Sequence, residues 1–366
     1  MTHHPIAADT LKRLVAHALS TVPRSARRWV MGLSMAGLLA CRPNDTVQVL
    51  PLPTLPAGPI ELRVAYVVND RLPRMSSVQL AGLLASMGAT AREHFGVELR
   101  FSAITELPIE RVFKGIPSGK RAEAFDDIFD FKSGGGDLAR LKTVFTKQFA
   151  AQSEPLADRI AFAQPYAPAL RGTASMEEFA SAIADLQLQR LNQWRDLKAV
   201  DGGTVIDGNP YNEFTLWLAL GYSDLPYELV LTNQVIASME FNYPSVHSAI
   251  RGGYTNGITT HNKQSRYGTM SVWSTFAFTD NSDYWVKMRN GERYEPMEAA
   301  QLAGAAAAHE VGHQLWHLAH PFARPACVMS PVPMFAYREW RGKLSAPNCR
   351  LGSDPSVTPG AFKFQY

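Results

Sequence analysis

Cysteine is scarce in this chain, with three residues among 366. So low a content excludes a small disulfide scaffold, and the length is sufficient for one large or two ordinary domains. Charge is also modest, because charged residues make up 19% of the chain and the net charge is +3. No run of lysine and arginine is interleaved with aromatic residues, so we expect no binding to nucleic acid.

Long apolar runs, internal repeats and phosphate-binding loops are also missing. The longest N-terminal apolar stretch, residues 29–40, is too short for a comfortable membrane span. The glycines at 134–136 lack the lysine and the spacing of a phosphate-binding loop, which favours a flexible turn. What remains is a chain with 46% hydrophobic residues, a normal value for a globular protein.

The N-terminus carries the parts of a secretory signal. Arginines at positions 24, 27 and 28 precede the apolar stretch 29–40, which ends in Leu-Leu-Ala before Cys41, so small residues stand before a cleavage point. The sequence Leu-Leu-Ala-Cys at 38–41 resembles the lipobox of bacterial lipoproteins, which implies cleavage before Cys41 and acylation of that cysteine. We therefore expect residues 1–40 to be a signal peptide and the mature protein to be exported, lipid-anchored in the bacterial cell envelope and periplasm-facing. An uncleaved anchor and an ordinary signal peptide are the alternatives.

Export bears on the two remaining cysteines. Cys327 and Cys349 can pair in an oxidising compartment, and such a disulfide would close a loop near the C-terminus. The alternative is two unpaired buried thiols, since sequence alone does not fix the distance between them. Closer to the N-terminus, prolines recur through residues 41–59, which indicates an extended linker between the membrane and the folded part.

The rest of the chain, residues 60–366, is predicted to form one α+β domain. Strands are expected at 60–68, 97–104, 227–232, 254–260 and 269–278, and helices at 76–95, 297–308 with the residues that follow, and 334–343. The opening strand–helix–strand order predicts a parallel strand pair. Residues 107–225 are rich in helical stretches, notably 137–150 and 175–200, and we interpret them as a mostly helical insertion.

The strongest motif is His309-Glu310-Val311-Gly312-His313, which has the form HExxH. Residues four apart share one face of a helix, so His309 and His313 can bind one zinc ion while Glu310 reaches a water molecule at the metal. Alanines dominate the preceding segment, which predicts that the motif lies on a buried helix. Gly312 would let that helix approach a neighbour closely.

Catalytic zinc normally takes three protein ligands, so the third must be found. On an uninterrupted helix His317 would lie about 6 Å beyond His313, on the far side from His309. His320 precedes Pro321, and a residue before proline is driven away from helical angles, so the chain can turn back at about residues 318–320. His320 is therefore the preferred third ligand, with His317 and then Glu339 as alternatives.

Residues 309–331 resemble the metzincin clan of zinc peptidases. Its members carry HExxHxxGxxH and then a turn with a methionine beneath the metal, and Met329 stands in such a sequence here. The resemblance implies a zincin-like fold with a mixed twisted sheet, in which an antiparallel edge strand, residues 254–260 or a neighbour, holds a peptide substrate. Trp316 stands where the family has glycine, and Ala319 where it has the third histidine.

These observations lead to an expected function. Zinc would polarise the substrate carbonyl and acidify water, and Glu310 would act as general base and then acid in peptide bond hydrolysis. The alternative is a non-catalytic zinc-binding lipoprotein that binds envelope protein or peptidoglycan. Tyr337 could donate a hydrogen bond to an oxyanion, although packing is the simpler role. His247 and His261 could line a cleft, but lone histidines are more often surface or packing residues.

Overall fold

The computed structural model describes residues 48–114, 129–130, 135–136, 138–151, 155–194, 197–198, 202, 224–237, 246–332 and 334–364. The elements below all belong to the unit Val49–Tyr366. They form a mixed α/β structure, which confirms the α+β class at this level. The expected signal peptide and Cys41 lie outside the described residues.

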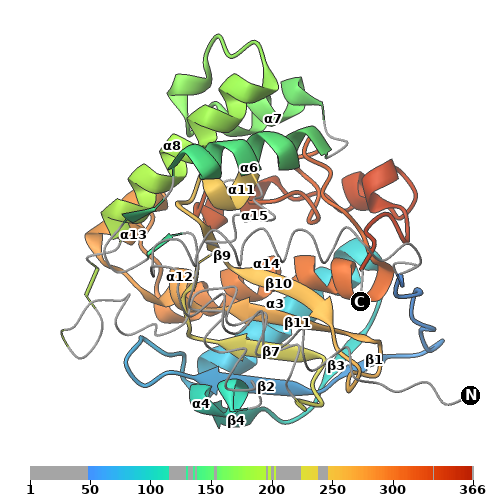
Figure 1. Cartoon of the computed structure of the whole chain (residues 1–366). Coiled ribbons are helices and arrows are strands. Elements are labelled where there is room, and N and C mark those ends of the chain that lie inside the picture. The colour runs from blue at the N-terminus through green and yellow to red at the C-terminus, as the bar shows by residue number, and fades with distance from the viewer. Residues whose placement is uncertain are drawn as a thin grey trace, which may run out of the picture. The chain divides into compact units, whose positions relative to one another are not determined.

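The central sheet has five strands in the order β10-β11-β7-β2-β4 (Figure 1). They are β2 (Val64–Val68), β4 (Thr105–Pro108), β7 (Leu229–Thr232), β10 (Gly257–His261) and β11 (Thr269–Ser274). Strand β10 runs antiparallel to β11, and the other neighbouring pairs are parallel, so the sheet is mixed as expected. Alternate residues of β2 enter two different cores, which places packed side chains on both faces.

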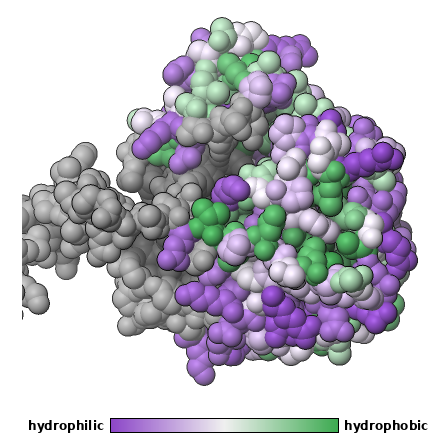
Figure 2. All heavy atoms as spheres, turned by 90° about the vertical axis from the view of Figure 1, so that its right-hand side faces the viewer, coloured by the Kyte–Doolittle hydropathy of each residue, from purple (hydrophilic) through white to green (hydrophobic). Residues whose placement is uncertain are grey.

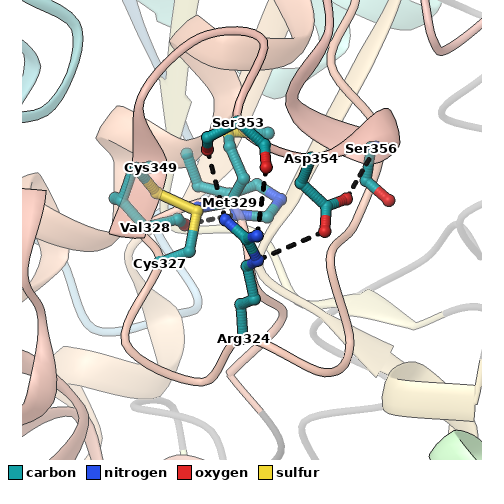
Figure 3. Close-up of a disulfide and its surroundings, with 9 residues drawn as sticks. Arg324, Cys327, Val328, Met329, Cys349, Ser353, Asp354 and Ser356 are labelled. Carbon is teal, nitrogen blue, oxygen red and sulfur yellow. Dashed lines mark hydrogen bonds and ion pairs between the residues drawn. A yellow bond between two sulfur atoms is a disulfide. The ribbon is translucent and has the colours of Figure 1, made fainter. Parts of the chain in front are cut away.

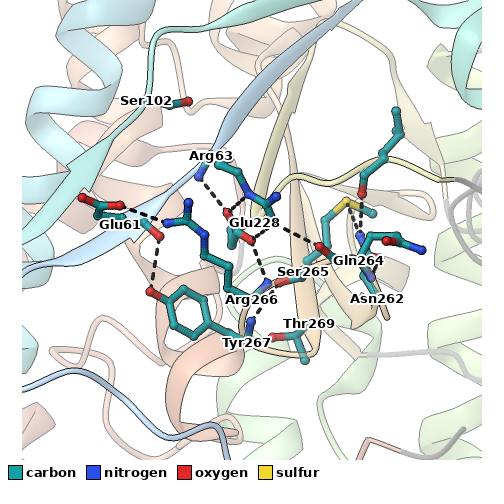
Figure 4. Close-up of polar contacts among 12 residues, drawn as sticks. Glu61, Arg63, Ser102, Glu228, Asn262, Gln264, Ser265, Arg266, Tyr267 and Thr269 are labelled. Atoms are coloured by element: carbon teal, nitrogen blue, oxygen red, sulfur yellow. Dashed lines mark hydrogen bonds and ion pairs between the residues drawn. The ribbon is translucent and has the colours of Figure 1, made fainter.

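The expected strand 60–68 is broken at Arg63 into β1 (Ile60–Leu62) and β2. The Arg63 backbone N–H donates to the carboxylate of Glu228 at 2.8 Å, and the guanidinium donates to the same carboxylate at 2.6 and 3.0 Å (Figure 4). A side chain therefore replaces a strand partner at this position. Strand β1 instead pairs with β3 (Leu99–Phe101), in parallel, as the strand–helix–strand order predicts.

Helices α3 (Ser77–Phe95) and α14 (Pro296–Trp316) pack side by side on one face of the sheet (Figure 1). Helix α3 begins at a capping box formed by Ser76 and Gln79, and it ends at Gly96, whose φ is 71°. The contact is close because α14 is rich in alanine and glycine. A Cβ at Gly304 would lie 2.0 Å from the Leu83 carbonyl oxygen, so only glycine fits there.

The described part of the expected insertion is mostly helical. It contains α6 (Leu138–Ala151), α7 (Leu156–Ala163), a 3₁₀ turn (Pro168–Leu170) and α8 (Met176–Trp194). Phe145, Phe149 and Phe179 are fully buried between α6 and α8. The insertion was expected to begin at residue 107, but residues 105–108 form strand β4 of the central sheet. The short helix α4 (Ile109–Phe113) also packs against this sheet, beside β2 and β4.

Shorter elements complete the described chain. They are β5 (Phe129–Asp130), β6 (Gly135–Gly136), β8 (Ile236–Ala237), β9 (Tyr254–Thr255), α11 (Val246–Ala249), α12 (Phe276–Thr279), α13 (Asp283–Met288), α15 (Tyr337–Lys343) and 3₁₀ turns at Ala346–Cys349 and Pro355–Val357. The strand expected at 269–278 was too long, because the chain enters α12 after Ser274. There the Ser274 hydroxyl donates to the Gln234 carbonyl at 2.6 Å.

The first described residues lie along the body of the domain. The Leu50 N–H donates to the Phe364 carbonyl at 3.0 Å, and Leu55 packs against the main core. The described part of the expected linker therefore contacts the C-terminal residues. Among the described helices, none is long and apolar enough to cross a membrane.

Candidate metal centre

Three histidine side chains converge at the end of α14. The Nε2 atoms of His309 and His313 are 2.8 Å apart, and that of His320 lies 3.1 Å from the first and 3.0 Å from the second. One turn of helix brings His309 and His313 to the same face. The structure thus brings together the two motif histidines and the preferred third ligand, and these three residues are close enough to bind a metal ion.

His320 reaches the cluster because α14 ends four residues before it. His317 takes the left-handed conformation, with φ 51° and ψ 46°, and its N–H donates back to the carbonyls of Gly312 and His313. The backbone then reverses, and the Ala319 N–H donates to the Ser356 carbonyl at 2.8 Å. The reversal was expected at 318–320, next to the proline, and it begins instead at His317.

Backbone carbonyls orient the two motif imidazoles. The Nδ1 of His309 lies 2.9 Å from the Val328 carbonyl oxygen, and the Nδ1 of His313 lies 2.5 Å from that of Leu318. A proton on each Nδ1 satisfies these contacts and leaves the Nε2 lone pairs pointing at one another. Burial lowers the pKa of His313 to about 4 and holds that of His320 well below its usual value, so both rings are neutral near pH 7.

The spacing of these nitrogen atoms suits a tetrahedral ion. Zinc–nitrogen bonds of about 2.0–2.1 Å place neighbouring tetrahedral ligands about 3.3 Å apart. The observed separations of 2.8 to 3.1 Å are slightly shorter. Without a cation, three electron-rich nitrogen atoms would face each other at this distance, so the donor set fits a bound metal. Imidazole ligands alone are compatible with zinc, copper, iron or nickel.

Glu310 is buried beside the cluster and contacts strand β10. Its side chain is 5% exposed, and its Oε2 accepts a hydrogen bond of 2.6 Å from the Thr259 hydroxyl. Burial raises the pKa of Glu310 to about 7, and the bond from Thr259 opposes that rise. A group with such a pKa can both accept and release a proton near neutral pH.

The turn after the helix packs beneath the motif. A Cβ on Gly312 would lie 2.2 Å from the sulfur of Met329, so the glycine makes room for this fully buried methionine. The expected close approach of the helix to a neighbour is thus explained. Val328, whose carbonyl holds His309, immediately precedes Met329.

A disulfide fastens this turn to the C-terminal segment. Cys327 and Cys349 are bonded, with their Cα atoms 4.9 Å apart, which confirms the expected pair (Figure 3). Nearby, Arg324 binds the carboxylate of Asp354 at 3.2 Å and the carbonyl of Ser353 at 3.0 Å. These contacts fix the backbone on both sides of the turn that supports His309.

The other residues considered from the sequence lie elsewhere. His317 is 2% exposed and packs on Phe364, with ring centroids 4.8 Å apart. Glu339 pairs with Lys343 on the exposed side of α15. Tyr337 is 1% exposed and packs against other aromatic rings. The structure therefore does not bring His317, Glu339 or Tyr337 into the histidine cluster.

His247, considered from the sequence as a residue that could line a cleft, lies close to the cluster. Its ring meets that of His320 edge to face, with ring centroids 5.1 Å apart, and its buried Nδ1 has no hydrogen-bond partner among the residues that the structure describes. Burial lowers its pKa to about 3, so the ring is neutral. It belongs to α11, far from the motif in sequence, and no spacing rule links the two. Thr259 was expected only as part of the strand at 254–260. Because side chains alternate along a strand, this alternation could have indicated that Thr259 and Gly257 share a face.

No family model matches this chain, and neither the curated proteins nor the solved structures contain a match. The site is therefore interpreted from its own geometry.

Aromatic side chains lie on two sides of the cluster. The ring centroids of Phe362 and His313 are 6.1 Å apart, and Phe362 is 44% exposed. The ring centroids of Phe322 and His320 are 6.0 Å apart. Phe322 in turn contacts Phe162 of α7, edge to face at 5.0 Å, so the helical part touches the loop that carries His320. Figure 2 shows apolar side chains gathered on the face of the molecule that it presents. The surroundings of the site are apolar on these sides.

Proposed function

We propose that this protein is a zinc-dependent endopeptidase with a metzincin-like fold. The observation that carries the proposal is the convergence of three neutral imidazoles beside a buried carboxyl on the same helix. A site that only bound metal would need the histidines and would have no use for Glu310 at that position.

The chemistry follows from these residues. His309, His313 and His320 would hold zinc, which when bound acidifies water and polarises a carbonyl group. Glu310 takes the proton from the attacking water and passes it to the leaving amine. Because burial lowers the pKa values of His313 and His320, their imidazoles are neutral at neutral pH and can act as ligands. Zinc is favoured over other metals because the HExxH arrangement pairs it with a general base.

A peptide is the favoured substrate because β10 is the outermost strand of the sheet. One edge of β10 pairs with β11, and among the described strands none pairs with the other edge. An extended peptide can add to such an edge through backbone hydrogen bonds. The carboxyl of Glu310 contacts Thr259 of the same strand, so a peptide bound there would lie near the general base.

The end of α14 supports the metzincin-like assignment. In that clan the helix-ending glycine stands three residues before the third histidine. Here His317 has the left-handed conformation, and His320 follows it three residues later. Both features are displaced by one residue together, and Met329 lies beneath the motif. The departures at Trp316 and Ala319 are thus consistent with a one-residue longer helix.

We also propose that the enzyme is exported to the bacterial cell envelope and tethered by lipid at Cys41. The disulfide between Cys327 and Cys349 supports an oxidising compartment. Mass spectrometry of the membrane fraction should find diacylated Cys41 at the mature N-terminus, and Cys41→Ser should abolish that species. A retained, unmodified residue 1–40 segment would contradict the proposal.

The enzymatic proposal is tested on the purified chain in detergent. We expect one zinc per chain and casein hydrolysis, with Glu310→Gln retaining zinc while its kcat falls about 10²- to 10⁴-fold. His320→Ala should lose zinc, and the matched control His317→Gly should retain it. Stoichiometric zinc with no Glu310-dependent hydrolysis would favour the non-catalytic binding protein. Zinc loss in the His317 variant alone would overturn the ligand assignment.

A further inference from the structure

The carboxyl of Glu310 rests on one face of strand β10. Its Oε2 accepts a hydrogen bond of 2.6 Å from the Thr259 hydroxyl, and its Oε1 lies only 2.2 Å from the position that a Cβ of Gly257 would take. Residues two apart in a strand point to the same face, so Gly257 and Thr259 together line the surface on which the carboxyl lies. Thr259 donates a hydrogen bond to the carboxyl, and Gly257, which has no side chain, leaves room for it.

The Thr259 hydroxyl is itself held by a buried polar chain. It lies 3.0 Å from the hydroxyl of Ser271, the residue directly opposite on β11. The single proton of the Ser271 hydroxyl can go to Thr259 or to Oε1 of Gln314, which lies 3.3 Å away. Gln314 is fully buried, and its amide donates to the carbonyls of Glu228 at 2.9 Å and Thr269 at 3.2 Å, which fixes its oxygen toward Ser271.

This chain begins and ends on the same helix, because Gln314 stands one turn after Glu310 on α14. The segment of that helix before His309 is rich in buried alanine, whereas Glu310 and Gln314 are buried polar residues one turn apart. A hydroxyl can donate to an ionised carboxylate and accept from a protonated one. The same contact therefore suits Glu310 before and after it takes a proton.

We propose that Thr259 and Gly257 are positioning residues that fix the Glu310 carboxyl for proton transfer. This inference rests on the proposed function. Thr259 holds Oε2, so Oε1 is the oxygen left to meet water. The edge strand would then have two roles, since the strand that pairs with the substrate also orients the general base.

The test compares Thr259→Val, Thr259→Ser and the control Thr260→Val in the zinc-loaded full chain. Valine matches threonine in shape and suits a strand, so it removes only the hydroxyl. We expect Thr259→Val to lower kcat about 10- to 100-fold with KM, zinc content and melting temperature unchanged, because small misplacements of reacting groups have effects of that size. Serine should restore activity. Thr260 points to the opposite face and should tolerate valine.

Gly257→Ala is the second variant. Its methyl group would lie 2.2 Å from Oε1 and 2.6 Å from Cε3 of Trp273, so it would displace the carboxyl, and kcat should fall while zinc is retained. Unchanged kcat in both Thr259→Val and Gly257→Ala would overturn the inference. So would failure of Thr259→Ser to restore activity, or loss of zinc in Thr259→Val, since either result would indicate a structural role.

Binding of acetohydroxamate, measured by calorimetry, separates this inference from the proposed function. The hydroxamate binds zinc and gives its proton to a neighbouring base, so its affinity reports the position of Glu310 without any hydrolysis. We expect Glu310→Gln and Thr259→Val to weaken binding at least threefold, and Thr260→Val to leave it unchanged. If the parent chain hydrolyses no peptide but shows this pattern, the peptidase proposal fails and the positioning role stands. Equal affinity in Thr259→Val and the parent would overturn the positioning role.

Discussion

Gly312→Ala sets two effects of opposite sign against each other within the metal motif. Alanine in place of glycine stabilises a helix interior by about 1 kcal/mol. At this position, however, the new Cβ would lie 2.2 Å from the sulfur of Met329 and 3.1 Å from Cζ of Phe95. Met329 is fully buried and cannot move into solvent. Overpacking of this kind costs about 1–3 kcal/mol, so the net effect should lie between no change and a loss of about 2 kcal/mol.

The same change should weaken metal binding more clearly than it weakens the fold. Moving Met329 also moves Val328, whose carbonyl accepts the hydrogen bond from His309 at 2.9 Å. Loss of such an orienting contact typically lowers metal affinity by about 10- to 100-fold. The zinc affinity of Gly312→Ala, measured by competition with a chromophoric chelator, should therefore fall by about that factor.

Gly342→Ala is the matched control. Gly342 also lies within a helix, α15, but a Cβ there would meet nothing within 4 Å. This variant should gain up to about 1 kcal/mol and bind zinc as the parent does. Denaturant unfolding followed by circular dichroism compares the two. If Gly312→Ala were as stable as Gly342→Ala and kept the parent's zinc affinity, the close packing of Met329 beneath the motif would be refuted.

Three further predictions test the frame of the site by thermal or denaturant unfolding. Glu228→Gln should cost about 2 kcal/mol at pH 7, because it removes a fully buried charge from an ion pair, whereas Glu61→Gln, in an exposed pair, should cost less than about 1 kcal/mol. Burial raises the pKa of Glu228, but hydrogen bonds from Arg63 and Arg266 lower it further, so the folded-state pKa lies below the usual value. The stabilisation from the ionised Glu228 is therefore complete above the unfolded-state pKa of about 4.3, and it is lost as the pH falls through the folded-state pKa. Equal losses for the two variants, or a gap that widens in acid, would contradict this reasoning. His317→Ala should be about 1 kcal/mol less stable than His317→Gly, since φ is 51° there, and the reverse order would exclude backbone strain. Replacing Cys327 and Cys349 with serine should cost about 3 kcal/mol for a separation of 22 residues, and an unchanged midpoint would show that the bond does not stabilise the fold.

Much of the fold was predictable from local signals. Helix α3 follows from its capping residues and apolar spacing, and α14 follows from its alanines. The breaks in the strands were not predictable. The strand at 60–68 divides at Arg63 because Glu228, distant in sequence, binds the backbone N–H there. Tertiary contacts of this kind leave no periodic trace in the sequence.

The residues of the site also divide into those that could be predicted from the sequence and those that could not. His309, Glu310 and His313 follow from helix geometry, and the proline after His320 indicates that the helix cannot continue. His247 and Thr259 reach the site through α11 and β10, whose positions depend on the sheet order. A single chain gives no signal for that order, so the sequence offered His247 only as a possible cleft residue and Thr259 only as part of a strand.

Under the proposed metzincin-like assignment the third histidine stands one residue late, and helix geometry accounts for this displacement. A helix extended by one residue turns its exit by about 100° and moves it about 1.5 Å along the axis, so a ligand at a fixed distance from His313 would miss the ion. The left-handed residue moves with the helix end, and the three-residue step from His317 to His320 then returns the chain to the same place. Trp316, the last residue of α14, packs on Phe95 with ring centroids 5.1 Å apart, which stabilises the end of the helix. The number of residues from the left-handed residue to the ligand is therefore the spacing with physical meaning, because it describes the turn. The number of residues from His313 to the ligand also includes the length of the last part of the helix.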